Sequence, residues 1–182
     1  DPRKLSPLAY SFMAGLLAHA QGFCALTNPL VNSYKRLISG YEAPHSIAWS
    51  SSNRSALIRI PAPRGQDTRL ELRSPDPSCN PYLAFAACLA AGLDGIERGL
   101  TPPEEIAENL YAMDAAQLRS HGVAELPDTL EAAVAALEAD EVITAALGPH
   151  VAGQYITGKR REWSDYRAQV TPWELERYLI TY

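Results

Sequence analysis

Residues 28–44 separate an apolar helical segment from a set of short strands. Their apolar side chains follow neither the helical period of 3.6 nor the strand period of two, and Pro29, Gly40 and Pro44 interrupt any regular element. The run also carries two adjacent cations and one carboxylate: Lys35, Arg36 and Glu42. A loop with fixed charges and few small polar residues is more often a site than a spacer. The sequence therefore predicts a functional loop here.

Regular elements are expected on both sides of this loop. Ser6 and Pro7 form a favourable helix start, and the apolar run behind them predicts one helix to about Thr27. Downstream, short strands are predicted at 47–49, 56–60 and 69–73, with an exposed connection at 61–68. A long apolar helix is expected from Asn80 to about residue 93.

The chain changes character after residue 99, where helical patterns dominate. Helices are predicted from Pro102, from 129–141 with Asp128 as the cap, from 149–169 and from Thr171 onward. The expected fold class is α+β. Residues 1–100 would form an active-site region of antiparallel strands packed with helices, and residues 101–182 a helical C-terminal layer and tail.

Composition excludes several classes of protein. The 182 residues are 47% hydrophobic, enough for one substantial core. The net charge is −5 and the cations are scattered, so no basic stripe suggests nucleic acid. No apolar run approaches the ~18 residues of a membrane span. The three cysteines have no paired or metal-type spacing, which is typical of a reduced, cytoplasmic protein.

The strand predicted at 69–73 places its charges on one face. Its period of two sends Leu70 and Leu72 to one side and Arg69, Glu71 and Arg73 to the other. A half-solvated edge strand explains this pattern by itself. Two further arginines, Arg54 and the Ile-flanked Arg59, favour a site for a negatively charged substrate, with phosphate a good candidate. The glutamate would pair with the arginines or hold a divalent cation.

These segments resemble blocks of the type I glutamine synthetases. The matching patterns are Asn-Pro-x-x-Asn-Ser-Tyr-Lys-Arg-Leu…Gly-Tyr-Glu-Ala-Pro at 28–44, Asn-Arg-Ser-x-x-x-Arg-Ile-Pro at 53–61, and Arg-x-Glu-x-Arg-x-Pro-Asp-Pro at 69–77. Similarity is nearly continuous over residues 6–100 and weaker to the end. The resemblance implies the C-terminal part of the catalytic domain, with the strands of its active-site half-barrel.

The resemblance also implies a role for each charged residue. The arginines would bind anions: the α-carboxylate of glutamate at Arg36, the transferring phosphate at Arg54 and Arg73, and the nucleotide at Arg59 and Arg69. The carboxylates would act differently. Glu71 would bind the metal next to the nucleotide phosphates, and Glu42 would cover the site as a flap and help to deprotonate ammonium.

The implied reaction joins glutamate and ammonium with ATP, through γ-glutamyl phosphate, and needs two Mg²⁺ or Mn²⁺ ions. The implied assembly is a homo-oligomer, a dodecamer in the complete protein. The family's other metal ligands lie in upstream motifs that this sequence does not contain, and none of the four histidines has a suitable context. We therefore expect the chain alone to be inactive.

Other readings remain open. A related γ-glutamyl-amine ligase, a non-catalytic assembly or regulatory chain that keeps the fold, and a generic anion-binding domain would share many of these features. Tyr111 falls where some type I enzymes are adenylylated, but its surroundings depart from that pattern. The tail at 166–174 resembles instead the variety regulated by glutamine feedback.

Overall fold

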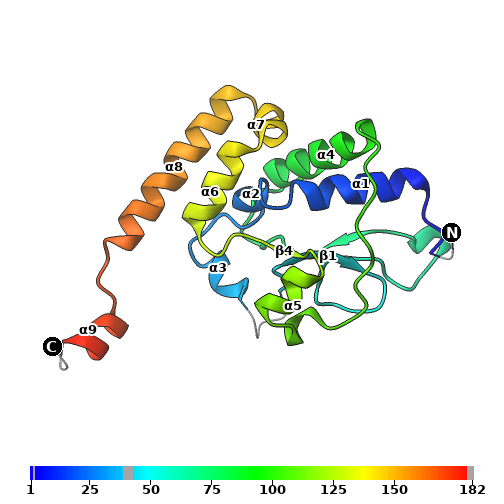
Figure 1. Ribbon diagram of the computed structural model, residues 1–182. Coiled ribbons are helices and arrows are strands. Elements are labelled where there is room, and N and C mark those ends of the chain that lie inside the picture. The colour runs from blue at the N-terminus through cyan, green and yellow to red at the C-terminus, as the bar shows by residue number, and fades with distance from the viewer. Residues whose placement is uncertain (2, 39–42, 180–182) are drawn as a thin grey trace.

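A computed structural model describes residues 1, 3–38 and 43–179. Four strands form one sheet in the order β3-β2-β1-β4: β1 Ser46–Ser50, β2 Ala56–Arg59, β3 Glu71–Leu72 and β4 Ala124–Glu125. Two long helices, α1 (Pro7–Ala18) and α4 (Pro81–Glu97), lie side by side along one side of this sheet (Figure 1). The predicted α+β fold class is confirmed.

One strand pairing differs from the predicted antiparallel arrangement. β1 and β2 are parallel, with Ser46 opposite Ala56, whereas the β1–β4 and β2–β3 pairs are antiparallel. The connection 51–55 makes this pairing sterically possible, because an extended chain covers about 3.3–3.6 Å per residue and can return along the short strand. β2 therefore starts beside the start of β1. β3 is also shorter than the predicted strand 69–73.

The first predicted helix divides into two. Ser6 caps α1 as expected, with its Oγ accepting from the backbone N–H of Ala9 at 3.2 Å. However, α1 ends at Ala18, and a separate short helix, α2, spans Cys24–Thr27. The prediction of a single helix to Thr27 was wrong. His19 ends α1, and its side chain contacts Asp94 of α4 and Asp140 before α7, which no local pattern predicts.

α4 is confirmed and runs longer than predicted. Asn80 caps it, and glycines allow it to lie very close to α1, since a Cβ on Gly15 would come 2.1 Å from the carbonyl oxygen of Ala91. Its opposite side exposes large apolar side chains, which we call the α4 apolar face: Tyr82, Phe85, Leu89 and Leu93. A helix with apolar side chains on both faces is usually buried on both faces.

The helix predicted from Pro102 is absent. Residues 101–108 instead run along β1, where the Trp49 indole Nε1 donates to the Pro103 carbonyl at 2.8 Å and the Ile106 N–H donates to the Trp49 carbonyl at 3.2 Å. Backbone groups used in this way cannot form helical bonds. The region after residue 100 thus adds α5 (Ala115–Ser120) and β4 before its helical layer begins, and β4 pairs with β1.

The remaining helices form the C-terminal layer, with two differences from prediction. Thr129 caps α6 (Leu130–Ala139) in place of Asp128, and Asp140 ends α6 and caps α7 (Glu141–Leu147). α8 (Pro149–Arg167) and α9 (Pro172–Tyr178) are confirmed. Three short elements complete the described chain outside this layer: α3 Ser33–Arg36 and two 3₁₀ turns, Gly65–Asp67 and Leu110–Ala112.

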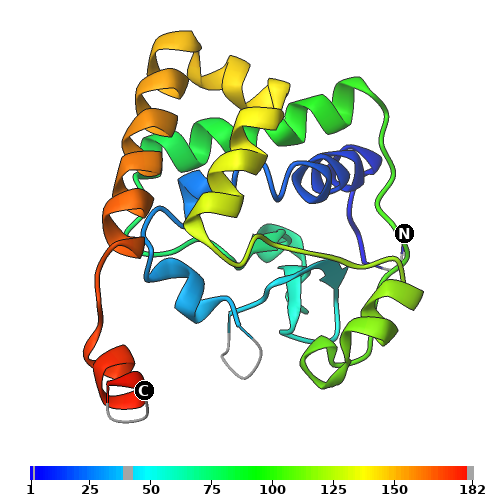
Figure 2. The same ribbon diagram turned by 60° about the vertical axis from the view of Figure 1, so that its left-hand side comes forward.

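α9 stands apart from the rest of the molecule in both ribbon views (Figures 1 and 2). None of its residues is buried, although it carries Trp173, Leu175 and Tyr178.

All three cysteines are unpaired, as predicted. No helix within the described ranges has the length and hydropathy that a membrane crossing requires.

His19 links three helices through two carboxylates. Its Nδ1 lies 2.7 Å from Asp140 Oδ2 and its Nε2 lies 3.0 Å from Asp94 Oδ2. Burial of the ring opposes protonation, but the two carboxylates outweigh it and raise the pKa of His19 above its usual 6.5. Protonated His19 thus holds the ends of α1, α4 and α7 together.

This arrangement predicts a pH-dependent stability. The raised pKa means that the contribution of His19 is fully present below about pH 6.5 and is lost as the pH rises through the folded-state pKa. We expect the free energy of unfolding, measured by urea titration, to fall over this range. Asp140→Asn retains a good helix cap but removes one charge, so it should weaken the dependence.

The matched control for this experiment is Asp128→Asn, an exposed residue just before α6. It should leave the pH dependence unchanged. An equal dependence in the Asp140→Asn protein would show that His19 is not the group responsible.

Candidate anion-binding site

Glu71 lies between two arginines at the junction of β2 and β3. Arg59 is its register partner on β2, and Arg59 Nη2 lies 2.9 Å from Glu71 Oε2. Arg69 Nη2 lies 2.6 Å from the other oxygen, Oε1. Burial opposes ionisation of Glu71, but these two guanidinium groups hold its pKa below the usual value. The carboxylate is therefore ionised and offsets part of the local positive charge.

Arg73 brings further positive charge to the same place. Its backbone N–H donates to the Leu57 carbonyl at 3.0 Å, which fixes the chain just beyond β3. Burial lowers the pKa of Arg73, and the charges of Arg59 and Arg54 add to this effect. Its Nη1 is buried and makes no hydrogen bond to any described residue. A buried guanidinium that lacks such a partner is suited to binding an anion.

An open depression of about 370 Å³ lies over this cluster. Its lining is dominated by arginines, prolines and the polar residues of the connection between β1 and β2: Ser51, Ser52, Asn53, Arg54, Arg59, Pro61, Ala62, Pro63 and Arg69. Guanidinium forks bind phosphate oxygens in pairs, so this chemistry favours a phosphate-bearing ligand.

Arg36 reaches the cluster from the other side. It ends α3, and its Nη2 donates to Asn28 Oδ1 at 3.1 Å and to the carbonyl of Ser74, the residue after Arg73. Asn28 is completely buried, and its own amide donates to Thr27 Oγ1 at 3.1 Å. The buried amide of Asn28 thus sets the orientation of Arg36, a role that the sequence did not predict.

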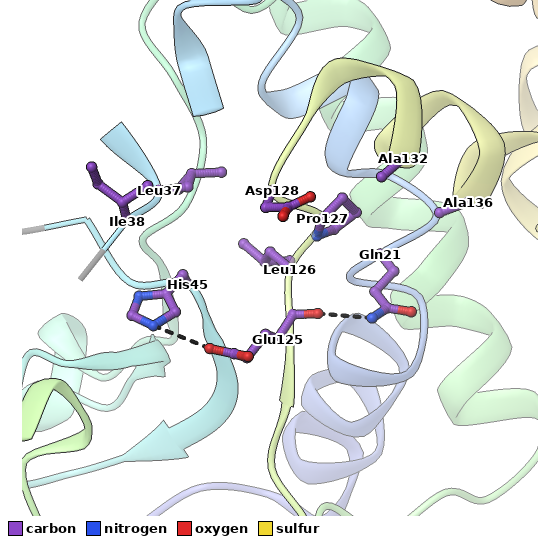
Figure 3. Close-up of a pocket in the computed structure, with 10 residues that line it drawn as sticks. All are labelled: Gln21, Leu37, Ile38, His45, Glu125, Leu126, Pro127, Asp128, Ala132 and Ala136. Atoms are coloured by element: carbon purple, nitrogen blue, oxygen red, sulfur yellow. Dashed lines mark hydrogen bonds and ion pairs between the residues drawn. The ribbon is translucent and has the colours of Figure 1, made fainter. Parts of the chain in front are cut away.

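A second depression lies outside this cluster (Figure 3). It has a volume of about 540 Å³, and its side chains come from the turn after α1, the residues after α3, the segments around β1 and β4, and α6: Gln21, Leu37, Ile38, His45, Glu125, Leu126, Pro127, Asp128, Ala132 and Ala136. His45 Nε2 lies 3.4 Å from Glu125 Oε1, and Gln21 Nε2 donates to the Glu125 carbonyl at 2.7 Å. It contains none of the predicted site residues.

Tyr111 lies near the arginines. Its ring stacks on His45 with 6.3 Å between centroids, and its phenol is close enough to Arg73 to affect the pKa of that residue. Its hydroxyl oxygen is buried. A modifying enzyme would need this residue to move outward first.

The structure brings together most of the residues that the sequence predicted. Arg54, Arg59, Arg69, Glu71 and Arg73 form one cluster, and Arg36 joins it through Ser74. Glu42, the predicted flap residue, lies outside the described residues. Across the described ranges, no group of three or more His, Cys, Asp or Glu side chains could hold a metal ion, so Glu71 belongs to no such group here.

The fold and the cluster define an α+β domain with a group of arginines around Glu71 at the edge of its sheet. Residues 1–178 match the family model described as glutamine synthetase, catalytic domain. The chain is 60% identical to the glutamine synthetase of Thermus thermophilus over 98% of its length, and 54% identical to that of Clostridium saccharobutylicum over 100%. It belongs to the glutamine synthetase catalytic domain family.

The match is to part of a longer protein. The chain spans only about 40% of the length of these curated relatives. Solved structures agree: one described as a GmaS/ADP complex superposes with a TM-score of 0.85 and 44% identity, covering 97% of this chain and 40% of that one. A ligand-free GmaS structure gives a TM-score of 0.83. The predicted membership of the glutamine synthetase family is therefore confirmed, and the type I subtype stays a prediction.

The buried contact to Arg36 gives a direct prediction. Asn28→Leu keeps a similar volume but leaves Arg36 and Thr27 without their partner, which should lower the free energy of unfolding by about 1–3 kcal/mol in urea titrations. Asn28→Asp, which keeps the acceptor for Arg36, should lose less.

Asn32→Leu is the matched control, because Asn32 is exposed and its side chain caps nothing. It should be nearly neutral. If Asn28→Leu is equally neutral, the amide does not hold Arg36.

Proposed function

We propose that this chain is the part of a glutamine synthetase that binds the phosphates of ATP and the substrate glutamate. The observation that carries this proposal is the cluster of arginines around Glu71, with Arg36 held at its border. Its support is the 60% identity to a glutamine synthetase. The ADP named for the related GmaS structure is consistent with a nucleotide site.

The proposed reaction has two steps. The γ-carboxylate of glutamate attacks the γ-phosphorus of ATP, which breaks the bond to ADP and forms γ-glutamyl phosphate. Ammonium loses a proton to a carboxylate, and the resulting ammonia attacks the carbonyl carbon. Inorganic phosphate leaves, and loss of one further proton from the nitrogen gives the amide of glutamine. Phosphorylation turns a poor leaving group into a good one, and closure of the site keeps water from the acyl phosphate.

The residues divide this work by charge. Arg36 would hold the α-carboxylate of glutamate. Arg54 and Arg73 would stabilise the transferring phosphate, because their positive charges would offset the negative charge on its oxygens. Arg59 and Arg69 would bind the nucleotide phosphates. Glu42 would act as the flap base that accepts the proton of ammonium.

Glu71 is the proposed metal ligand, but both of its oxygens are now engaged by arginines. Phosphate oxygens are strong alternative partners for these guanidinium groups. We propose that nucleotide binding draws Arg59 and Arg69 away and leaves Glu71 to hold Mg²⁺ or Mn²⁺. The ion would neutralise phosphate charge. Its further ligands would come from outside the described residues.

The isolated chain is proposed to be inactive. It spans about 40% of the relatives' length, and it exposes the α4 apolar face, where Phe85 is 74% exposed. Family resemblance is the only support for several finer proposals, namely a dodecameric assembly, a cytoplasmic location, and feedback regulation by glutamine in preference to adenylylation of Tyr111. The burial of the Tyr111 oxygen agrees with the last of these.

A related γ-glutamyl-amine ligase is the alternative. The 60% identity to the Thermus thermophilus glutamine synthetase favours the synthetase reaction over this alternative. The arginine cluster also speaks against a non-catalytic chain, since repulsion among like charges is costly without a bound anion.

A chimera tests the proposal. This chain replaces the matching region of the Thermus thermophilus enzyme, and phosphate release from ATP is measured with Mg²⁺, glutamate and ammonium. We expect turnover from the chimera and none from the chain alone. Arg73→Gln should lower kcat by about 10²–10³-fold, as removal of one preorganised donor does elsewhere.

Arg161→Gln is the control, because this side chain is 86% exposed on α8. It should leave kcat unchanged. Turnover that requires a primary amine in place of ammonium would favour the alternative ligase. A folded chimera that uses neither would contradict the proposal.

The flap role of Glu42 has its own test in the same chimera. Glu42→Gln cannot accept the proton of ammonium, so turnover should fall by about 10²-fold or more while ATP binding is retained. Glu131→Gln, an exposed change on α6, is the control. Unchanged turnover in the Glu42→Gln protein would remove the flap role.

A further inference from the structure

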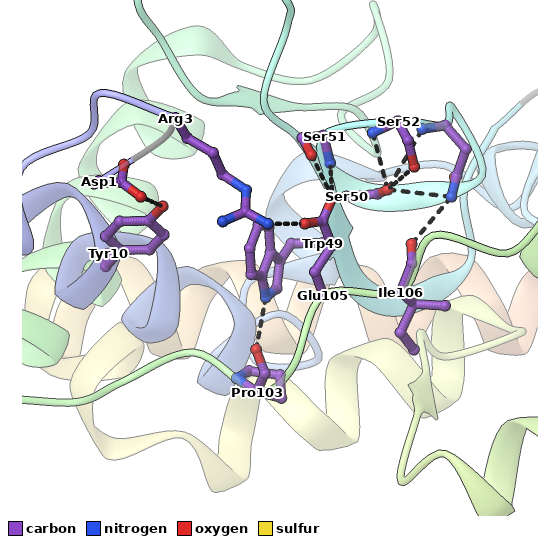
Figure 4. A network of polar contacts seen from close by, with 11 residues as sticks. Asp1, Arg3, Tyr10, Trp49, Ser50, Ser51, Ser52, Pro103, Glu105 and Ile106 are labelled. Carbon is purple, nitrogen blue, oxygen red and sulfur yellow. Dashed lines mark hydrogen bonds and ion pairs between the residues drawn. The ribbon is translucent and has the colours of Figure 1, made fainter.

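The connection between β1 and β2 is braced by a glutamate from a distant part of the sequence (Figure 4). The Ser51 backbone N–H donates to Glu105 Oε1 at 2.6 Å, and the Ser51 hydroxyl donates to the same oxygen. The other oxygen, Oε2, accepts from Arg3. Glu105 is therefore shared between the N-terminus and the loop 51–55.

A second brace lies two residues along the loop. The Asn53 amide nitrogen contacts the carbonyl oxygens of Ile106, Ala107 and Glu108 at 3.1, 3.0 and 3.0 Å. Its carbonyl oxygen accepts from the backbone N–H of Ser55 at 2.9 Å. The loop is thus attached to the segment 105–108 on both sides of Ser52.

The bracing segment is itself fixed. Trp49 anchors it through the bond from its indole to Pro103, and the Arg3 guanidinium lies 5.1 Å from the centre of the Trp49 ring. Only 17% of the Glu105 side chain is exposed. Burial opposes ionisation of Glu105, but Ser51 and Arg3 outweigh it and keep its pKa below the usual value. The carboxylate is a charged, partly buried acceptor, which makes its hydrogen bonds strong.

The loop that it holds forms much of the candidate anion site. Residues 51–54 line the 370 Å³ depression together with Arg59 and Arg69. Arg54 is an exposed residue near the end of this loop, and its positive charge helps to lower the pKa of Arg73. If this loop were mobile, anion binding would have to order it. The conformational entropy lost in ordering the loop would weaken the affinity for the anion.

We propose that Glu105 is a positioning residue for the anion site. It fixes the backbone of the loop 51–55 so that Arg54 and its neighbours are preorganised to bind the phosphate groups of the nucleotide. This role rests on the proposed function of the depression. Glu105 does not touch the ligand, and it acts only through the loop.

The first test measures binding of inorganic tripolyphosphate to the chain by titration calorimetry at low salt. Glu105→Ala should weaken binding about tenfold, since a lost hydrogen bond to a charged group has about that effect. Glu104→Ala is the matched control, because Glu104 is the exposed neighbour. It should bind like the unchanged protein. Glu105→Gln keeps an acceptor for Ser51 and should stay within about threefold.

The second measurement is amide hydrogen exchange. Glu105→Ala should speed exchange at residues 51–55 and leave β2 and α4 protected. Weaker binding without faster exchange in the loop would overturn the positioning role. So would equal binding by the Glu105→Ala and Glu104→Ala proteins, weak binding by Glu105→Gln, or no binding by the unchanged chain.

The two proposals can fail separately. An inactive chimera, together with the expected tripolyphosphate and exchange results, would remove the glutamine synthetase reaction and keep Glu105 as the residue that orders an anion site. An active chimera with no effect of Glu105→Ala would do the reverse.

Discussion

The two-sided ion pairing of Glu71 is the interaction on which the candidate site depends. Without a carboxylate between them, Arg59 and Arg69 would repel one another and the nearby Arg73. With it, the guanidinium groups stay close while the surplus positive charge remains available to an anion. The antiparallel pairing of β2 and β3 makes this possible, because it sets Arg59 directly opposite Glu71.

The surroundings of the cluster are held by buried polar groups. Asn28 and the Ser74 carbonyl orient Arg36 from one side, and Glu105 fixes the loop of Arg54 from the other. Each of these contacts gives a hydrogen-bond partner to a partly or fully buried donor. Each contact therefore stabilises the fold and also orders the site. His19 does the same for the helical layer with Asp94 and Asp140.

Three helix starts were predictable from their caps, and several helix ends were not. Ser6, Asn80 and Thr171 cap helices with their own side chains, which is a local effect that the sequence displays. The breaks at His19 and Asp140 depend on partners more than 100 residues apart. The helix expected from Pro102 failed for a similar reason, since its backbone pairs with β1. Local propensity gives way where tertiary hydrogen bonds are available.

By itself, the sequence determined the family, the approximate positions of the first three strands and the charged residues that they carry. Alternation along 69–73 and the misplaced Arg59 were sufficient to predict an anion site, because side-chain direction in a strand follows from its period of two. Only the tertiary structure decided which groups hold those residues. Glu105 lies 54 residues from Ser51, and Ser74 lies 38 residues from Arg36. No local pattern records such contacts, since they form only when packing brings the segments together.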